Sequence, residues 1–244
     1  MAVGGRDMRP AYEAFIEEHR TQGWHQVEPG KGEDHIRFFG THNLVAFDLF
    51  RRFGMPASAG DRHLAEFMPA AEYLADPARW GFALTPVDYR VQDRAAKIAR
   101  AEALLAGDIA PEAARTEEAL VDQIVALMGG TPYVSNVNLP NQGQMPGLPL
   151  GAVVETNAQF SGLGITPHVA SRLPTALEPI VNDHATRQQA LLAAVMAGDR
   201  DALFPLFHSD PLVAPLDETR ARAMYTEMTA ATAAWLPDAL KGAA

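Results

Sequence analysis

One short segment gathers four residue types that can do chemistry. Residues 60–67, GDRHLAEF, contain an aspartate, an arginine, a histidine and a glutamate. On a helix, His63 and Glu66 are three residues apart and share a face. Both could then bind one metal ion, or Glu66 could orient His63 without touching the metal. A His-x-x-Glu pair is also common on exposed helices, and spacing alone favours this ordinary polar face.

A second cluster consists of amide side chains in residues 135–144, SNVNLPNQGQ, which follow a predicted strand. Asn136, Asn138 and Asn141 offer hydrogen-bond donors and acceptors together, which suits sugar hydroxyls as well as the backbone of a tight loop. Residue chemistry alone narrowly favours loop capping. Long loops rich in proline and glycine inside a compact domain are, however, often functional.

The remaining polar residues have structural explanations of equal weight. His184 and Gln188 fall on the otherwise apolar side of the longest predicted helix, where a hydrogen-bonded core histidine is commoner than a ligand. His25, His35 and His42 lack the tight spacing of metal ligands, and we expect them to be solvated. The sequence has no P-loop, G-x-G-x-x-G, G-x-S-x-G or H-E-x-x-H motif, which argues against the usual nucleotide, acyl-transfer and zinc-protease sites.

Composition narrows the function classes further. The 244 residues carry a formal charge of −10, which argues against a nucleic-acid partner. The sequence contains no cysteine, so any metal would bind His, Asp, Glu or water. No apolar run is long enough for a signal peptide or a membrane span, and we therefore expect a cytoplasmic protein without a membrane partner.

The elements that must position these residues are mostly helices. Apolar periodicity, with glycine or proline at the ends, predicts helices over 11–20, 43–53, 87–106 and 174–197, one beginning at Thr116, and a last one beginning at Asp217. The predicted apolar face of the Thr116 helix is Leu120, Ile124, Leu127 and Met128; that of the last helix is Met224, Met228, Ala231 and Trp235. Residues 133–137 and 152–156 read as short strands. One mainly helical domain is the simplest interpretation.

Taken in order, these segments resemble the family 4 glycoside hydrolases from about residue 43 to residue 237. The matching blocks are NLVAFDLFRRFG, PASAGDRHLAEFMP, SNVNLPNQGQMPGLPLGAVVETNA, GITP, RLPTALEP and DPLV. The resemblance implies an α/β (α+β) fold, mainly helical with a small, largely antiparallel sheet, like the C-terminal domain of lactate and malate dehydrogenases. Residues 41–244 would be the C-terminal catalytic and substrate domain, and residues 1–40 a region connecting it to a Rossmann-type domain that this chain lacks.

The resemblance also implies an NAD- and manganese-dependent reaction. In that family, bound NAD oxidises the C3 hydroxyl of the sugar, a base removes the C2 proton, and the metal stabilises the resulting charge. The C1 substituent is then eliminated, water adds, and the ketone is reduced again. The family's metal-binding histidine corresponds to His63, whereas its second ligand, commonly an upstream cysteine, has no counterpart here. Tyr89, Asp88 and Asp108 are the candidates for the base.

The phrase VVETNAQFS resembles the branch that contains α-galacturonidases and related α-glycosidases. A uronic acid needs a cation for its carboxylate, and Arg62, Arg52 or Arg172 could provide it. Arg172 stands where the family more often has a small residue before Leu-Pro. A carbohydrate substrate and a homo-oligomer are the partners that the resemblance implies.

Two other functions stay open: a degenerate domain that serves in sugar binding or assembly, and an inert truncated fragment. If a nucleotide-binding half is missing, we expect an exposed apolar patch or a dimer that hides it. His63 alone should bind manganese weakly, because manganese prefers several oxygen ligands. We also expect His63 to lie beside the amide-rich turn around Asn138, in a hollow large enough for a sugar.

Overall fold

The computed structural model describes residues 2–25, 37–111 and 118–240, and the chain divides into two compact units, residues 1–117 and 118–244. The predicted boundary at residue 40 falls inside the first unit, and the domain division stays a prediction.

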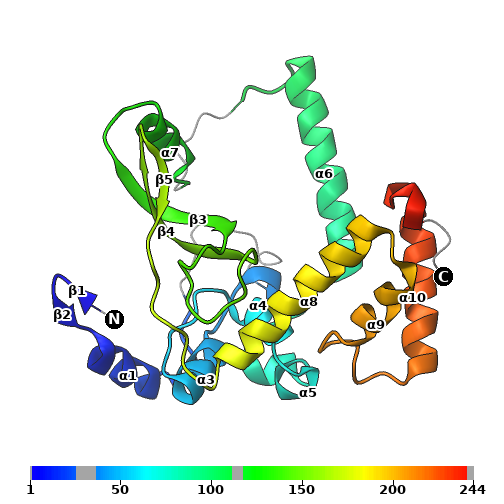
Figure 1. The fold of residues 1–244 in the computed structure, drawn as a ribbon, viewed down its shortest axis with the longest axis horizontal. Helices are drawn as coiled ribbons and strands as arrows, with labels where there is room; N and C mark the ends of the chain where they lie inside the picture. The colour runs from blue at the N-terminus through cyan, green and yellow to red at the C-terminus, as the bar shows by residue number, and fades with distance from the viewer. Residues whose placement is uncertain (1, 26–36, 112–117, 241–244) are drawn as a thin grey trace. The chain divides into compact units, whose positions relative to one another are not determined.

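Figure 1 shows the elements of each unit. The first contains β1 (Ala2–Val3), β2 (Arg6–Asp7), α1 (Arg9–Glu18), α3 (Leu44–Phe53), α4 (Asp61–Glu66), α5 (Ala70–Tyr73), the 3-10 helix η1 (Pro77–Trp80) and α6 (Val87–Ala106). The second contains α7 (Leu120–Leu127), β3 (Tyr133–Pro140), β4 (Val153–Ser161), β5 (Gly164–Pro167), α8 (Glu178–Ala197), α9 (Arg200–His208), α10 (Glu218–Thr232), η2 (Ala233–Trp235) and η3 (Asp238–Leu240).

The core of the first unit lies between α1 and α3. Ile16, Phe47 and Phe50 are buried together, and the ring of Tyr12 meets that of Phe50 edge to face at 4.8 Å. Helix α3 ends where the sequence predicts, at Gly54, which takes a left-handed φ of 69° and donates its N–H to the Phe50 carbonyl. Helix α3 also contacts α4, and the Ala46 N–H of α3 donates to Asp61 of α4.

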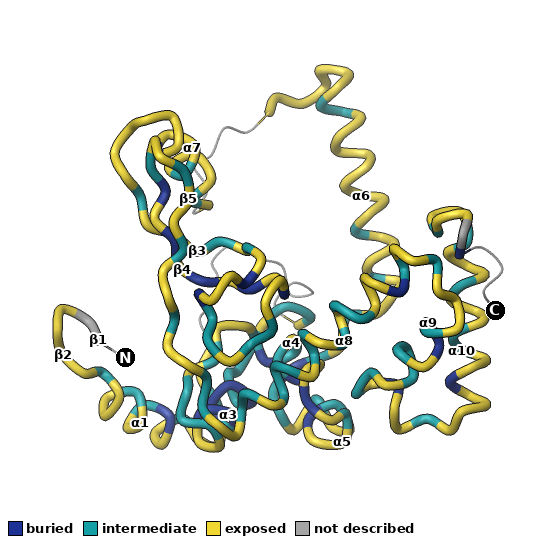
Figure 2. Tube along the Cα trace, viewed as in Figure 1, coloured by how far each residue is buried: buried dark blue, intermediate teal, exposed yellow. Residues whose placement is uncertain are grey.

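Helix α6 has the predicted bounds, starting after Pro86 and ending at Gly107, whose φ is 80°. None of its residues is buried, and most of the helix is exposed (Figure 2). The prediction of its length is confirmed.

A three-stranded antiparallel sheet in the order β3-β4-β5 organises the second unit. Side chains of β4 alternate strictly between exposed and buried, and Val154, Ala158 and Phe160 face the inside. Helix α7 covers this face through Ala126, which packs against Ala158 and Phe160. The small, largely antiparallel sheet is confirmed; β5, a third strand, was not predicted.

The predicted apolar face of the helix after Thr116 is wrong. Thr116 itself lies outside the described residues, and α7 begins at Leu120. Leu120, Ile124 and Met128 are 62%, 46% and 82% exposed, and Leu127 is exposed as well. Only the small side chain of Ala126 fits close to the sheet, so the large apolar side chains point away from it.

The C-terminal helices form two small cores of their own. Ala194 of α8 packs with Leu203 and Leu240, whereas Phe204 packs with Val213. Helix α8 ends at Gly198 as predicted but begins at Glu178, and α9 was not predicted as a separate helix. In α10, the Asp217 cap is confirmed because its side chain accepts the N–H of Arg220. Of the predicted stripe, Met224 packs against the cluster of Phe204 and Val213, whereas Met228, Ala231 and Trp235 are exposed.

The fold class is confirmed, because helices predominate and the described strands form one small three-stranded antiparallel sheet and a short two-stranded hairpin. Across the described ranges, no helix combines the length and the apolar character that crossing a bilayer requires.

Candidate functional site

Asp61 anchors the segment that carries Arg62 and His63. Its side chain is fully buried, and Oδ1 accepts the backbone N–H of Ala46 at 3.0 Å in the first turn of α3. Asn43, before that turn, has a left-handed φ of 59° and makes no side-chain cap, so Asp61 satisfies the helix end from the neighbouring helix. Burial raises the pKa of Asp61, and the hydrogen bonds from the α3 backbone and Thr41 oppose that rise.

His63 is accessible and has polar neighbours on both ring nitrogens. Its side chain is 57% exposed, Nδ1 lies 3.6 Å from Oε2 of Glu66, and Nε2 lies 3.4 Å from Nη2 of Arg62. The i,i+3 spacing therefore brings His63 and Glu66 together as the sequence predicts. The metal role of His63 stays a prediction.

Arg62 belongs to a cluster that sequence spacing did not reveal. Its guanidinium donates to the Phe38 carbonyl and to Thr85 Oγ1 at 3.0 Å, and it lies 5.1 Å from the ring centre of Phe39. Arg90 of α6 approaches the same ring at 5.0 Å. In the ranges that the structure describes, neither arginine forms an ion pair with a carboxylate. Two cations thus contact one aromatic ring, and the described residues place no carboxylate against either of them.

Tyr89 completes what we call the arginine–aromatic cluster: Phe38, Phe39, Arg62, Tyr89 and Arg90. The Tyr89 ring lies 5.0 Å from that of Phe38 and 5.9 Å from that of Phe39. Asp88 and Asp108, the other two candidates for the base, are exposed. The structure therefore brings one of the three candidates close to Arg62, and the identity of the base stays a prediction.

The other two candidate cations have carboxylate partners. Arg52 donates from Nη1 to Glu72 at 2.5 Å and to the Tyr73 hydroxyl at 2.9 Å. Arg172 makes two bonds of 2.7 Å to Glu178, which lower the pKa of that carboxyl. An arginine that already binds a carboxylate in this way offers less charge to a substrate, so Arg62 is the best placed of the three.

The amide-rich loop is held by its own side chains. Asn141 is buried, its Nδ2 donates to the carbonyls of Met145 and Leu148 at 3.1 and 3.0 Å, and its Oδ1 accepts the N–H of Gly143 and Met145. Gln144 is also buried and donates to the Pro140 carbonyl at 2.9 Å. These contacts favour loop capping for Asn141, and its role in substrate binding stays a prediction.

Asn136 and Asn138 lie on the exposed side of β3. Asn136 donates to Glu155 Oε1 of the neighbouring strand at 2.7 Å. In the strand register Asn136 is opposite Asn157 and Asn138 opposite Glu155, so polar groups form a row across the sheet. Such a row can bind hydroxyl groups, and substrate binding by these residues remains a prediction.

Of the histidines expected to be solvated, His25 is exposed, but His42 is half-buried. The two rings lie 4.9 Å apart and are tilted, and His42 Nδ1 lies 3.2 Å from the Gln22 carbonyl. His184 lies 3.4 Å from Arg187. His35 lies outside the described residues.

The donor set near His63 is incomplete for a metal ion. In the described part of the chain, no group of three or more His, Asp or Glu side chains could hold one. His63 and Glu66 supply at most two donors, whereas manganese prefers several oxygen ligands. The sheets that the structure describes are antiparallel and include no strand–turn–helix unit of the kind that binds NAD. The described residues therefore do not by themselves fit either group.

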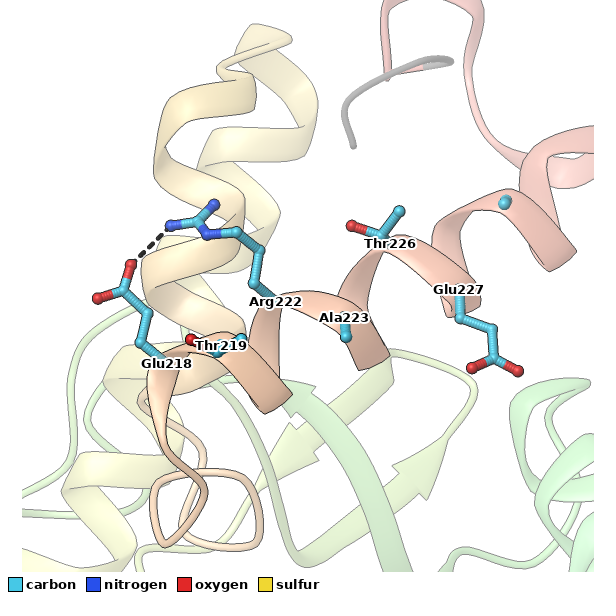
Figure 3. A pocket seen from close by; sticks show the side chains of 7 residues that line it. Glu218, Thr219, Arg222, Ala223, Thr226 and Glu227 are labelled. Carbon is cyan, nitrogen blue, oxygen red and sulfur yellow. Dashed lines mark hydrogen bonds and ion pairs between the residues drawn. The ribbon is translucent and has the colours of Figure 1, made fainter.

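A shallow hollow follows one side of α10, away from all the predicted site residues in the sequence (Figure 3). Its wall comes from a single helix: Glu218, Thr219, Arg222, Ala223, Thr226, Glu227 and Ala230. Arg222 donates to Glu218 at 2.8 Å and lies 3.9 Å from the Phe204 ring centre. The charge of Arg222 is already paired with Glu218, and all the lining residues belong to α10. This hollow therefore lacks the features of an active site.

Comparison with known proteins identifies the family. Residues 2–213 match the model of the family 4 glycosyl hydrolase C-terminal domain. The chain is 36% identical over 225 residues to the alpha-galacturonidase of Thermoanaerobacter italicus, covering 91% of this chain and 49% of the relative. It is 38% identical over 233 residues to the alpha-galacturonidase of Thermoanaerobacterium saccharolyticum, covering 94% and 50%. The chain thus spans about half the length of these curated relatives.

Solved structures agree with this assignment. The crystal structure of lplD from Bacillus subtilis matches with a TM-score of 0.82 and 36% identity, over 91% of this chain and 50% of that one. A 6-phospho-alpha-glucosidase from gut microorganisms, in complex with NAD and Mn2+, matches with a TM-score of 0.66 over 96% of this chain and 51% of that one. At 15% identity the second match shows the fold alone. This chain belongs to glycosyl hydrolase family 4 and corresponds to the C-terminal domain of that family.

Proposed function

We propose that this chain is the substrate-side part of a glycosidase that cleaves α-galacturonides, and that Arg62 and Arg90 bind the carboxylate of the sugar. The observation that carries the proposal is the arginine–aromatic cluster, in which two guanidinium groups share the Phe39 ring beside His63 without a carboxylate partner among the described residues. The alpha-galacturonidase names of the relatives support a uronic acid as the substrate.

Physical chemistry favours a carboxylate at this place. A guanidinium binds a carboxylate through two parallel N–H bonds, and this geometry gives both affinity and orientation. The contacts of Arg62 with Thr85 and the Phe38 carbonyl restrict its side chain before any ligand arrives. Less conformational entropy is then lost on binding. A neutral sugar can accept hydrogen bonds from the two arginines but lacks the charge attraction and the paired bonds of a carboxylate, so the cluster would distinguish galacturonides from galactosides.

The cofactors remain part of the proposal. NAD would supply hydride transfer and manganese would stabilise negative charge on the sugar, as the resemblance to family 4 implies. His63 would contribute one manganese ligand, and the remaining ligands and the NAD site would come from residues that the described ranges do not provide. This arrangement makes the chain one part of a complete catalytic unit.

A binding measurement tests the carboxylate site directly. We expect the chain to bind D-galacturonate more tightly than D-galactose in calorimetry, and Arg62→Gln or Arg90→Gln to weaken galacturonate binding about tenfold while leaving galactose unaffected. Arg100→Gln is the matched control, because it removes an exposed charge from α6 outside the cluster. Equal affinity for the two sugars would refute the carboxylate site.

An activity measurement tests the glycosidase assignment separately. With an amino-terminal half from an alpha-galacturonidase relative, NAD and Mn2+ supplied, we expect release of nitrophenol from an aryl α-galacturonide, in preference to the α-galactoside. Complete inactivity of a folded, assembled protein would contradict catalysis and leave the sugar-binding interpretation.

A further inference from the structure

The hydroxyl of Thr41 joins two segments of the first unit that supply the arginine–aromatic cluster. Its Oγ1 accepts the backbone N–H of Asp61 and that of Asn43, both at 3.2 Å. Thr41 follows Phe39 by two residues, and Asp61 directly precedes Arg62. The bond between Thr41 and Asp61 therefore connects the aromatic segment to the arginine segment, next to the cluster itself.

The side chain of Asp61 makes a second connection. It is fully buried, and its Oδ1 accepts the N–H of Ala46 in the first turn of α3 at 3.0 Å. Asp61 is thus held through its backbone N–H by Thr41 and through its carboxylate by α3. Because α4 begins at Asp61, these two bonds fix the part of the backbone from which the Arg62 side chain extends.

The backbone beside Thr41 has an unusual conformation. Among the non-glycine residues that the structure describes, Asn43 is the one with a positive φ, 59°. Asparagine tolerates this left-handed region better than most residues, but the conformation still costs free energy. It is held by the bond to Thr41 and by the bond from Asn43 Nδ2 to the Trp24 carbonyl at 2.6 Å. Backbone strain held by surrounding contacts in this way is concentrated at functional sites.

The cluster requires the two segments to stay close together. The Arg62 guanidinium donates to the Phe38 carbonyl and lies 5.1 Å from the ring centre of Phe39. A hydrogen bond is lost once donor and acceptor separate to about 3.6 Å. A guanidinium that binds a carboxylate through two parallel bonds also depends on orientation. A small shift of Asp61 away from Thr41 would therefore disturb the carboxylate site.

We propose that Thr41 and Asp61 are positioning residues for the carboxylate of the substrate. The bond between them holds residues 38–39 against Arg62, and neither side chain contacts the sugar. The inference rests on the proposed function, because it concerns the same carboxylate site. It adds that selectivity for a charged sugar depends on a hydroxyl group outside the arginine–aromatic cluster.

A contribution to folding alone is the ordinary explanation of such bonds. The two explanations differ in the property that a variant changes. A purely structural bond affects the free energy of unfolding and leaves the preference of the folded chain for D-galacturonate over D-galactose intact. A positioning bond affects that preference, which is the ratio of the two dissociation constants, in a chain that is still folded.

Thr41→Val tests the hydroxyl, because valine has nearly the shape of threonine but no Oγ1. We expect calorimetry on the full chain to show galacturonate affinity reduced about fivefold, with galactose affinity changed by less than about twofold. Thr41→Ser restores the hydroxyl and should recover most of the loss. Circular dichroism verifies folding, and Thr41→Ala, which also lacks the hydroxyl, replaces the valine variant if that variant does not fold.

A double-variant comparison tests whether Thr41 acts through Arg62. In an Arg62→Gln chain no guanidinium remains to be positioned, so adding Thr41→Val should not weaken galacturonate binding further. Gly54→Ala is the control for stability. It forces alanine into a φ of 69° at the end of α3, and its added Cβ would meet only the Arg9 guanidinium within 4 Å. This variant should unfold at lower urea and keep the wild-type preference.

The outcomes separate the inference from the proposed function. A wild-type chain that binds both sugars equally would refute the carboxylate site, and the inference with it. If the wild-type chain prefers galacturonate, a folded Thr41→Val chain that keeps the full preference refutes the positioning role alone. A loss that Thr41→Ser does not recover, or one that is equally large in the Arg62→Gln chain, also refutes it.

Discussion

At the scale of single residues, the buried carboxylate of Asp61 connects the fold to the site. It accepts the backbone N–H of Ala46, and its second oxygen, Oδ2, has no partner among the described residues. Asp61→Ala should lower the free energy of unfolding by about 1–3 kcal/mol, because the N–H groups of α3 lose a buried acceptor. Asp61→Asn keeps an acceptor oxygen and should cost less. Urea unfolding measures both values, and equal losses would show that the hydrogen bond is unimportant.

The Arg172–Glu178 pair gives a prediction about pH. The bonds from Arg172 lower the pKa of Glu178, so the carboxylate favours the folded state above its unfolded pKa. That contribution is lost as the pH falls through the lowered folded pKa. We expect NMR titration to place the Glu178 midpoint below the ordinary glutamate value, and Arg172→Gln to return it upward.

Arg220→Gln, which removes another exposed arginine, is the control for that titration. A Glu178 midpoint that does not respond to Arg172→Gln would mean that the two bonds are absent in solution. Arg172 would then regain its place as a candidate for the substrate carboxylate.

Residue chemistry and spacing predicted part of the candidate site. The i,i+3 rule correctly placed His63 beside Glu66, because that contact is local. The sequence could not rank Arg52, Arg62 and Arg172 as ligands of the substrate carboxylate. The partner of Arg52, Glu72, lies on another helix, and sequence spacing does not reveal such a contact. Arg90 was missed for the same reason: its neighbour Phe39 is remote in the sequence.

At the scale of elements, two glycines have nearly the same backbone φ but different surroundings. Replacing each with alanine therefore separates the cost of backbone strain from the cost of steric contact with neighbouring atoms. Gly54 ends α3 with φ 69°, and Gly81 ends η1 with φ 70°. A Cβ on Gly54 would meet only the Arg9 guanidinium at 3.7 Å, whereas one on Gly81 would lie 2.7 Å from His42 Cβ. Gly54→Ala should cost about 1–2 kcal/mol from the left-handed angle alone, and Gly81→Ala should cost clearly more.

Thermal or urea unfolding of the two variants measures that difference. Gly107→Ala provides the reference, because its φ of 80° is similar and no atom lies within 4 Å of the added Cβ. If Gly81→Ala were no worse than the other two, the close packing of His42 against Gly81 would be disproved.

Helix ends were predicted better than helix faces. Gly54, Gly107 and Gly198 end α3, α6 and α8 at the expected places, because a left-handed C-terminal residue is a local requirement. Apolar spacing shows which side chains share a face, but what covers that face depends on the tertiary structure. The face of α7 was wrong and that of α10 largely wrong for this reason, since most of both stays exposed.

At the scale of the whole molecule, the candidate groups are distributed over both units. The arginine–aromatic cluster belongs to residues 1–117, and the amide-rich loop belongs to residues 118–244. That His63 and Asn138 face one sugar-sized hollow therefore stays a prediction, as does the boundary at residue 40. Matching sequence blocks can assign the segment around His63 and the amide-rich loop to one family. They do not define the distance between these two segments.

The uncovered face of α7 leads to the last prediction, which concerns the surface of the molecule. Six large apolar side chains lie exposed there: Leu120, Val121, Ile124, Val125, Leu127 and Met128. A contiguous apolar surface of this kind binds hydrophobic dyes, whereas scattered apolar residues do not. The chain should therefore increase the fluorescence of an anilinonaphthalene dye while fully folded. Combined Val121→Lys and Met128→Lys should remove most of that signal without lowering the melting temperature, because neither side chain packs against the sheet.

Asp122→Lys is the matched control, since it adds positive charge to the same helix and removes no apolar surface. It should keep the dye signal, and attraction of the anionic dye to the new charge could only strengthen it. Loss of signal in the double variant but not in the control would locate the dye on α7. If the folded wild-type chain does not increase the fluorescence of the dye, this face of α7 is covered in solution. Protection of the α7 amides from hydrogen exchange would then reveal the contact.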